Sequence, residues 1–600
     1  MLVKGTIGLG IRERKPVATP DKYSPDTIEE WLSNLPKANI GETSKQVYSL
    51  LNDSNKELLS PEQRSALLGQ LQETVALIAE VMKKHYMGMS VSLSEKQQKI
   101  ANFVQALDVE MAIGYKTVVE DLIADEKYQS KILVTAVNYC MHYLFHVQRR
   151  CYLLYRDLPK GMWHEIHLLY QLSEQNQFHE QKLLHANRAI SIVGSYKRIL
   201  LLSTANPNKL RQHDIELISN MFTTVSQMTR LDSDPTESHD FIVNLSSDTG
   251  PFHSSLLKSS MTARYRGISL DRAKAKIEQQ LNNEIPEQSM FKIDEFTLNH
   301  LLGAWGEMAT RTFARVDGEG MLEISIGMTA THHVITELLY DDEDIEAELS
   351  GNQLIESLEG SLKDAVILEP NDEAYLSQSA ESAQEQSDPG TIMSNPTRGR
   401  LGQADEQNDE PYKFIEQSKV DEPPTDNTQQ AAVINISPGG FCLELGSPLP
   451  KQTQAGEIIG LMEHGSDEHI TWNIGAIRWM RRKKSGELDI GVQLIAPNAK
   501  PVRAQLRNSH SNDNLYQRCL LLPAIKGIGQ PETLLTSPLP FREQAKVRIK
   551  SHKGTHDVLL VSQIDSGLSY KQFTYKILDT ELEGDMKDNH DDFDLVWKIM

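Results

Sequence analysis

The 600-residue sequence contains little cysteine, few aromatic residues and no long apolar run. A membrane-spanning helix needs about 18 or more apolar residues in succession, and no such window occurs. The nearest approach, residues 132–155, is interrupted by charged and amide side chains, so we expect a buried helix of a soluble domain. The four cysteines, Cys140, Cys151, Cys442 and Cys519, have neither metal-ligand nor redox spacing. We therefore expect no membrane span and a reduced, cytoplasmic compartment.

Positive charge is also scarce. The 61 Lys and Arg residues are outnumbered by 83 Asp and Glu residues, which gives a formal net charge of −22. This balance argues against a general nucleic-acid binder, whose affinity depends on neutralising phosphates with basic side chains. The first 16 residues lack the apolar core of a secretory signal. The length predicts about three to five domains.

Sequence motifs of enzymes are missing as well. No P-loop occurs, and the glycine pairs at Gly8 and Gly10 and at Gly527 and Gly529 lack the third glycine of a dinucleotide site. Helically spaced histidines occur at His142 and His146 and at His164 and His167. Such pairs can build a metal site, but without a His-Glu-x-x-His pattern they fit core or surface histidines better. We expect no catalytic residue, no metal and no cofactor.

The most informative stretch is the hexapeptide Asn435-Ile436-Ser437-Pro438-Gly439-Gly440. Alternating or β-branched sequence on either side predicts strands at 431–434, 441–445, 472–480 and 487–494. The hexapeptide has good turn chemistry, and a turn without any ligand would select the same residue types.

This order of strands and turn resembles a PilZ domain, a small β-barrel that binds the bacterial second messenger cyclic di-GMP. Members of that family use an (Asp/Asn)-x-Ser-x-x-Gly segment and an Arg-x-x-x-Arg segment. Asn435, Ser437 and Gly440 fill the former, and residues 475–479 and 490–494 resemble the later strands. The resemblance implies that Asn435 and Ser437 hydrogen-bond a guanine edge. It also implies that Gly440 permits a tight turn or a close approach to the ligand.

An Arg-x-x-x-Arg segment lies far upstream, at Arg311 and Arg315, and leads into an alternating strand pattern at 321–327. The two motifs of most PilZ domains are only a few tens of residues apart. The resemblance implies that both arginines bind phosphate or guanine through their charged, bidentate guanidinium groups. Both arginines also fit the cationic last turn of a helix, where they would complement the helix dipole.

An acidic stretch rich in Ser and Gln separates the two motifs, with few apolar residues and no sustained period. Such a segment buries too little apolar surface to offset its ordering entropy, so we expect it to be disordered. A long insertion in a surface loop costs little, because closure entropy grows only logarithmically with length. We therefore predict one PilZ-like antiparallel β-barrel split by a disordered acidic insertion, with Arg311 and Arg315 brought beside Asn435 and Ser437.

The remaining sequence predicts an α+β multidomain protein. Helical periodicity dominates the N-terminal half, where Ser60 and Gln63 flank a helix start as in a capping box. Short strands expected at 520–523, 545–549, 556–562 and 573–577 indicate a second small β-unit at the C-terminus. The expected divisions are a flexible N-terminus (1–22), a helical domain (23–232), a mixed α/β connector (233–310), the first part of the barrel (311–340), the acidic insertion (341–410), the main part of the barrel (411–505) and a C-terminal β-domain (506–600).

The function that these patterns favour is a cytoplasmic bacterial receptor that binds cyclic di-GMP and passes the signal to an unidentified protein partner through the helical region. A protein-binding scaffold with a degenerate barrel that binds no nucleotide is the alternative, and a metal-dependent hydrolase is the third possibility. A basic run at 478–484, expected at a hairpin turn, is either solvated turn charge or a source of positive potential near the ligand's phosphates.

Overall fold

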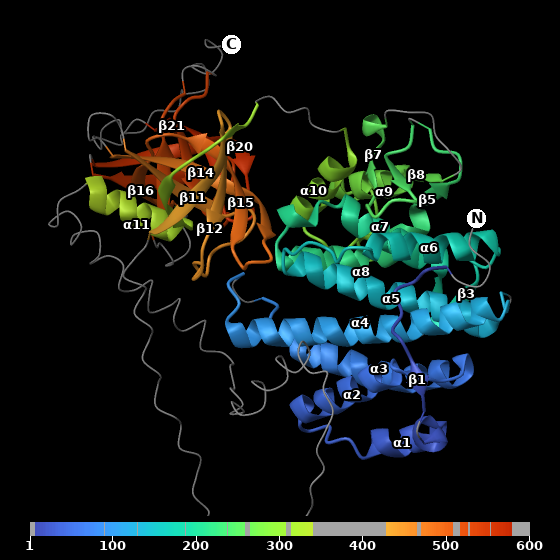
Figure 1. The fold of residues 1–600 in the computed structure, drawn as a ribbon. Coiled ribbons are helices and arrows are strands. Elements are labelled where there is room, and N and C mark those ends of the chain that lie inside the picture. Colours follow the sequence, from blue (N-terminus) through green and yellow to red (C-terminus); the bar gives the residue numbers. More distant parts are fainter. Residues whose placement is uncertain are drawn as a thin grey trace, which may run out of the picture. The chain divides into compact units, whose positions relative to one another are not determined.

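The computed structural model describes residues 7–17, 19–88, 91–128, 130–185, 188–236, 238–257, 264–307, 314–339, 428–464, 470–507, 516–525, 529–552 and 554–578 (Figure 1). By their internal contacts these residues divide into two compact units. The first unit holds the chain up to Ile326 together with residues 428–457 and 476–493. The second unit holds residues 327–339, 458–464, 470–475 and the described chain from Leu494 onward.

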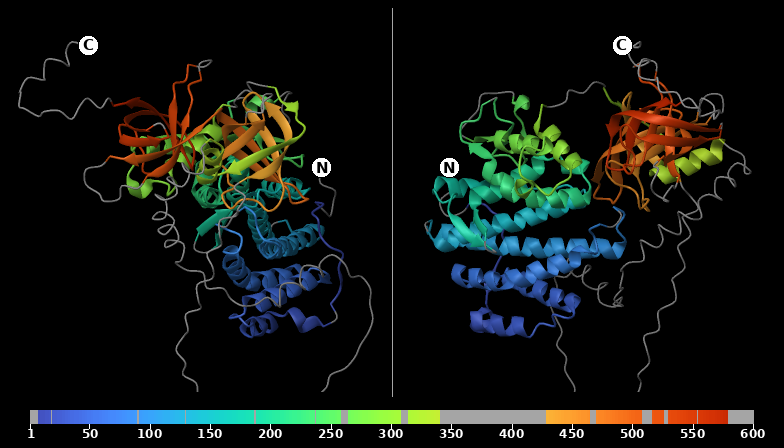
Figure 2. Two further views of the ribbon diagram at one scale, coloured as in Figure 1. Left: turned by 90° about the vertical axis from the view of Figure 1, so that its left-hand side faces the viewer. Right: turned by 180° about the vertical axis from the view of Figure 1, so that it is seen from behind.

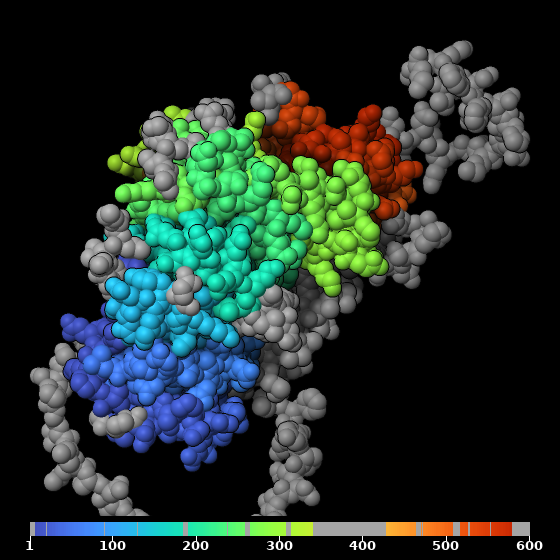
Figure 3. Space-filling model, turned by 90° about the vertical axis from the view of Figure 1, so that its right-hand side faces the viewer, coloured from blue at the N-terminus to red at the C-terminus, as the bar shows by residue number. Residues whose placement is uncertain are grey.

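Long helices build the N-terminal half of the chain. They are α1 (Pro25–Ser33), α2 (Ile40–Ser54), α3 (Pro61–Lys83), α4 (Glu95–Ala124), α5 (Lys131–Leu153), α6 (Met162–Gln175), α7 (Ile192–Thr204) and α8 (Gln212–Met228). They pack in layers that follow the chain, with α3 against α4, α4 against α5, and α5 against α7 and α8 (Figures 1 and 2). The space-filling view shows the same succession as bands from blue to green (Figure 3).

The helix starts follow the sequence. Ser60 caps α3, and Gln63 completes the predicted capping box, because its side chain accepts a hydrogen bond from the Ser60 main chain. Ser94 and Gln97 form a second capping box at α4. No helix in the described part of the chain has both the length and the apolar character needed to cross a bilayer.

The N-terminal segment lies along α4. The main-chain N–H groups of Ile7 and Leu9 donate to the Glu120 carboxylate over 3.1 and 2.6 Å. Arg14 donates two hydrogen bonds to Asp121, over 2.6 and 2.7 Å. The segment then forms β1 (Lys15–Pro16), which pairs in parallel with β2 (Glu57–Leu58). These contacts fall within the stretch that the sequence marks as a flexible N-terminus.

Two small sheets and two helices complete the part of the chain before the first barrel. β3 (Lys182–His185) and β4 (Arg188–Ser191) form a hairpin before α7. A four-stranded sheet has the order β5 (Arg230–Asp232), β8 (Tyr265–Ser269), β6 (Phe241–Asn244), β7 (Phe252–His253). α9 (Asp271–Leu281) and α10 (Glu295–Trp305) pack against each other.

A seven-stranded sheet follows, in the order β10, β13, β14, β15, β12, β11, β9. Its strands are β9 (Val316–Asp317), β10 (Met321–Ile326), β11 (Gln429–Ser437), β12 (Gly440–Leu445), β13 (Ile458–His464), β14 (Ile470–Arg482) and β15 (Leu488–Ala496). Because β11 also pairs with β10, six of these strands close into a ring. β10 precedes the insertion and β11 follows it, so the prediction of one barrel built from both sides of the insertion is confirmed. The insertion itself, 341–410, lies outside the described residues.

The C-terminal β-unit is a second, closed barrel, as the sequence predicts. Its order is β16 (Lys500–Leu506), β17 (Gln517–Leu522), β18 (Thr533–Thr536), β21 (Lys571–Ile577), β20 (Gly554–Ser566) and β19 (Lys546–Ser551). Buried apolar side chains, Val502, Leu534, Val547, Leu560 and Phe573 among them, form its core. An additional helix, α11 (Met328–Leu339), packs against β16 and β17, and His332 Nε2 lies 3.2 Å from the main-chain oxygen of Val502.

Candidate binding face on the first barrel

The hexapeptide found in the sequence forms the hairpin that joins β11 to β12. Asn435 pairs with Cys442, and Ser437 pairs with Gly440 across a two-residue turn. The Ser437 hydroxyl donates to the main-chain oxygen of Gly440 over 3.2 Å, which ties the two ends of the turn together. Asn435 and Ser437 are half-buried and lie on the same face of β11, because side chains two residues apart in a strand point the same way.

At Gly440 only glycine fits. Its φ is +150°, and a Cβ atom there would collide with the main-chain oxygen of Val492 on β15. The close approach is possible because Gly440 pairs with Gln493, the residue after Val492. Gly440 therefore sets how tightly the hairpin lies on its neighbouring strand.

The arginine segment reaches the other edge of β11. β9 pairs with β11 so that Asp317 lies opposite Asn435 and Val316 opposite Ile436. Arg315 is the next residue outward, is exposed, and shares the face of Asp317 and Asn435 by strand alternation. Arg315 thus stands at the register position beside Ser437, whereas Arg311 lies outside the described residues.

The face extends onto β15 and β14. Cys442 pairs with Gly491, and Gln493 lies two residues further along β15 on the same side. A Cβ atom on Gly491 would collide with the indole of Trp479, so this ring lies directly against the glycine. Arg478 Nε donates to Gln493 Oε1 over 2.8 Å. We call the set Arg315, Asn435, Ser437, Cys442, Trp479 and Gln493 the polar face.

Charges of both signs surround the centre of the polar face. Burial and the nearby Asp489 carboxylate raise the pKa of the Cys442 thiol, while Arg315, Arg481 and Lys483 act in the opposite direction. Arg481 pairs with Asp489 over 3.1 Å, and Lys483 pairs with Asp489 over 3.2 Å and also with Glu444. The buried Asp489 thus balances two cations of the basic run, and Lys484 remains exposed. The thiol is a packed neutral group, because a raised pKa disfavours the thiolate.

The histidines that the sequence singled out lie in the helical region. The rings of His142 and His146 are 4.3 Å apart between centroids, and His146 Nδ1 is 3.9 Å from Asp108. His167 is buried between the Tyr196 hydroxyl and the main-chain oxygen of Thr249, at 2.8 and 3.0 Å, and burial lowers its pKa to about 4. No group of three or more His, Cys, Asp or Glu side chains suited to a metal occurs among the described residues.

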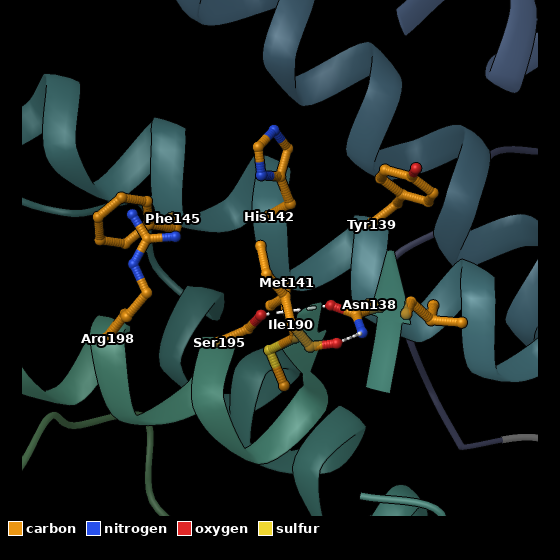
Figure 4. Close-up of a pocket in the computed structure, with 9 residues that line it drawn as sticks. Asn138, Tyr139, Met141, His142, Phe145, Ile190, Ser195 and Arg198 are labelled. Atoms are coloured by element: carbon orange, nitrogen blue, oxygen red, sulfur yellow. Dashed lines mark hydrogen bonds between the residues drawn. The ribbon is translucent and has the colours of Figure 1, made fainter. Parts of the chain in front are cut away.

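A small hollow opens beside His142, between α5, α7 and the β3–β4 hairpin (Figure 4). Ser195 donates to Asn138 Oδ1 over 3.3 Å, and Asn138 donates to the main-chain oxygen of Ile190 over 3.4 Å. The Arg198 guanidinium lies over the Phe145 ring, 4.3 Å from its centroid. These contacts engage Ser195, Asn138 and Arg198 with their neighbours.

Several acidic residues that border the polar face carry no motif of their own. Asp317, Glu444 and Asp489 are ordinary acidic residues in the sequence, and only the strand pairing brings them beside Asn435 and the basic run. The sequence pattern that could have identified Asp489 is the alternation of apolar and other residues along its strand. In residues 488–493, Leu488, Ile490 and Val492 are buried apolar residues, and Asp489, Gly491 and Gln493 share the opposite side.

Comparison with known proteins covers almost the whole chain. Residues 26–236 match the model of the N-terminal domain of the cyclic-di-GMP receptor FimW, residues 241–501 match its middle PilZ domain, and residues 502–578 match its C-terminal β-barrel domain. The chain is 30% identical to the cyclic-di-GMP receptor FimW of Pseudomonas aeruginosa in an alignment of 570 residues that covers 92% of this chain and 90% of that protein. No solved structure matches the chain. The chain belongs to the FimW family of cyclic-di-GMP receptors, and its first barrel is the PilZ domain of that family.

Proposed function

We propose that this chain is a receptor for cyclic di-GMP and that the ligand binds on the polar face of the first barrel. The observation that carries the proposal is the pairing of β9 with β11, which sets Arg315 beside the Asn435 to Gly440 hairpin. The two partners are far apart in sequence and meet on one face. Membership of a family of cyclic-di-GMP receptors supports the same ligand.

The residue types suit the ligand. Cyclic di-GMP has two phosphodiester anions and two guanine bases, whose O6 and N7 atoms accept hydrogen bonds from a forked guanidinium. Arg315 and Arg311 would supply such donors. Asn435 and Ser437 would supply shorter, directional hydrogen bonds to a guanine edge. Gly440 holds the turn in place and carries no side chain that would obstruct the ligand.

We infer further that the receptor acts through a protein partner at the helical region and works in the cytoplasm. The four cysteines are buried free thiols, as expected of a reducing compartment. The layered helices offer a large surface, which favours a binding role for this half of the chain. Affinity purification with the helical region intact and deleted tests the partner.

The binding proposal is tested by calorimetric titration of the purified full chain with cyclic di-GMP, beside the double variant Asn435→Ala/Ser437→Ala. We expect saturable heat for the natural sequence and at least about a tenfold weaker affinity for the variant, since two directional hydrogen bonds are lost. An absence of heat at saturating ligand would identify the chain as a family member with a degenerate barrel and would refute the proposal.

A further inference from the structure

Arg482, the last residue of β14, connects the first barrel to the helical region. Its main-chain N–H donates to the main-chain oxygen of Tyr155 over 2.7 Å. Its Nη2 donates to the main-chain oxygen of Val91 over 2.7 Å, and its Nη1 donates to the oxygen of Gly486 in the β14–β15 turn over 2.8 Å. The Arg482 side chain therefore hydrogen-bonds both the β14–β15 turn and the segment that precedes α4.

The receiving site on the helical region is firmly built. Tyr155 follows the end of α5 with a φ of +55° and is 1% exposed. Its hydroxyl donates to the main-chain oxygen of Leu210 over 2.8 Å, just before α8. Gln212, at the start of α8, donates back to the oxygen of Leu153 over 2.8 Å. These two hydrogen bonds link the end of α5 to the start of α8.

The same strand end also faces the polar face. Successive residues in a strand point to opposite sides, so Arg481 and Lys483 share one side and Arg482 takes the other. Arg481 and Lys483 pair with Asp489, and Lys483 also pairs with Glu444 on β12. Trp479, two residues before Arg481, lies against Gly491 within the polar face. The segment 481–483 therefore contacts both the helices and the two carboxylates, Asp489 and Glu444, that border the polar face.

Two other hydrogen bonds between these parts of the first unit are longer. The Leu449 N–H lies 3.4 Å from the Ser92 hydroxyl, and Arg211 Nε lies 3.4 Å from the main-chain oxygen of Ala455. Hydrogen bonds of this length are weak compared with those of Arg482. Arg482 consequently makes shorter hydrogen bonds to the helical region than either Leu449 or Arg211 makes across the same junction.

The charges around Arg482 determine which state of the hairpin the ligand favours. Burial and the neighbouring Arg156 guanidinium both disfavour the charged form of Arg482 and lower its pKa. Arg156 donates to Asn102 over 2.6 Å, and burial lowers its pKa as well. Two cations held close together in this way oppose docking of the hairpin, and a dianion bound on the neighbouring face would reduce that repulsion. Ligand should therefore favour the docked hairpin.

We propose that the β14–β15 hairpin transmits occupation of the polar face to the helical region, with Arg482 as the positioning residue. The inference rests on the proposed binding of cyclic di-GMP to that face. The bistable element is the hairpin, docked on Tyr155 and Val91 or released from them, and the ligand acts by shifting this equilibrium. Because such coupling is reciprocal, loosening the Arg482 contacts also weakens the ligand.

Hydrogen exchange of the full chain with and without cyclic di-GMP tests the inference, with calorimetry on the same samples. For the natural sequence we expect the ligand to slow amide exchange in peptides that cover residues 150–157. In Arg482→Ala the ligand should still bind, about 5- to 150-fold more weakly, and should leave the exchange of these peptides unchanged. Arg482→Lys, which keeps the charge but lacks the forked pair of donors, should fall between the two.

Lys484→Ala is the matched control, because it removes an exposed cation from the same turn. It should behave like the natural sequence in both measurements. Ligand heat without any change in exchange at 150–157 in the natural sequence would overturn the inference and leave the proposed function standing. So would full protection of these peptides in Arg482→Ala. If the natural sequence gives no heat with cyclic di-GMP, the proposed function fails first, and the inference fails with it.

Discussion

Arg150 Nη2 donates to Asp108 Oδ2 over 2.7 Å where both side chains are almost fully buried, 4% and 2% exposed. Burial alone would raise the pKa of Asp108, but Arg150 and His146 outweigh it and lower the pKa to about 2. Arg150 also donates to Gln105 over 2.8 Å. The pair joins α4 to α5 in the middle of the helical layers, so its integrity bears on the whole N-terminal half.

Replacing Arg150 by Met should destabilise the helical region by about 3 to 5 kcal/mol, because it leaves the Asp108 carboxylate buried without its main counter-ion. Urea unfolding followed by helical circular dichroism measures this loss. The exposed pair of Lys99 and Glu95, at 2.9 Å, supplies a control, since Lys99→Met should cost less than about 1 kcal/mol. Equal losses in both variants would contradict a special role for the buried pair.

Gly440→Ala should destabilise the first barrel by roughly 2 to 4 kcal/mol and abolish binding of cyclic di-GMP. The added Cβ would meet the Val492 oxygen at a backbone conformation that alanine rarely adopts. Gly446→Ala is the matched control, since no described heavy atom lies within 4 Å of its Cβ position. Urea unfolding followed by Trp fluorescence, with calorimetric titration, distinguishes the two variants. Normal stability of Gly440→Ala would show that the hairpin can move away from β15.

Arg315→Ala should weaken cyclic di-GMP by on the order of 1.5 to 3 kcal/mol, the usual contribution of a hydrogen bond to a charged group. The same cost is expected for Arg311→Ala. Binding by the natural sequence should weaken as salt is added, and this dependence should be shallower in either variant, since exposed charges are screened. Calorimetry at two salt concentrations measures both effects. An unchanged affinity in both variants would remove the arginines from the site.

The C-terminal barrel should lose stability as pH falls below about 6.5, because of His332. Burial, together with Arg518 and Arg503, lowers the pKa of this histidine to about 3 in the folded chain. Between the ordinary histidine pKa of about 6.5 in the unfolded chain and the pKa of about 3 in the folded chain, His332 is protonated only in the unfolded chain. The loss continues down to the folded pKa and reaches about 2 kcal/mol at pH 5.

Urea unfolding of the full chain at pH 7 and pH 5 checks the His332 prediction. His332→Gln keeps a donor for the Val502 oxygen and should unfold with a smaller difference between the two pH values. His556→Gln, at an exposed position of β20, should keep the full difference. An identical pH dependence in all three chains would mean that His332 opens to solvent before it is protonated.

The strands of the first barrel could be predicted because their side chains alternate. Leu488, Ile490 and Val492 are buried while Gln493 is exposed, and this pattern is visible without any partner strand. The turn at Pro438 and Gly439 could be predicted for the same local reason. The acidic residue beside this turn could not be predicted, because the pairing of Asp317 with Asn435 joins positions more than a hundred residues apart.

The helix α11 was not apparent in the sequence. It contains Thr329, Thr331, Val334, Ile335 and Thr336, which are β-branched and have a low intrinsic preference for helix. Packing against β16 and β17 overrides this preference. Contacts with other strands likewise determine the role of each cation in the basic run. Asp489 and Glu444 pair with Arg481 and Lys483, whereas Arg482 contacts the helical region.

The ladder between β10 and β11 joins Met321 to Ala432 and Ile324 to Gln429, so the two borders of the insertion are held to each other by main-chain hydrogen bonds. A protease cut between α11 and β11 should leave both fragments in one particle under native conditions. When the two fragments are co-expressed as separate polypeptides, we expect them to associate and to form a functional receptor.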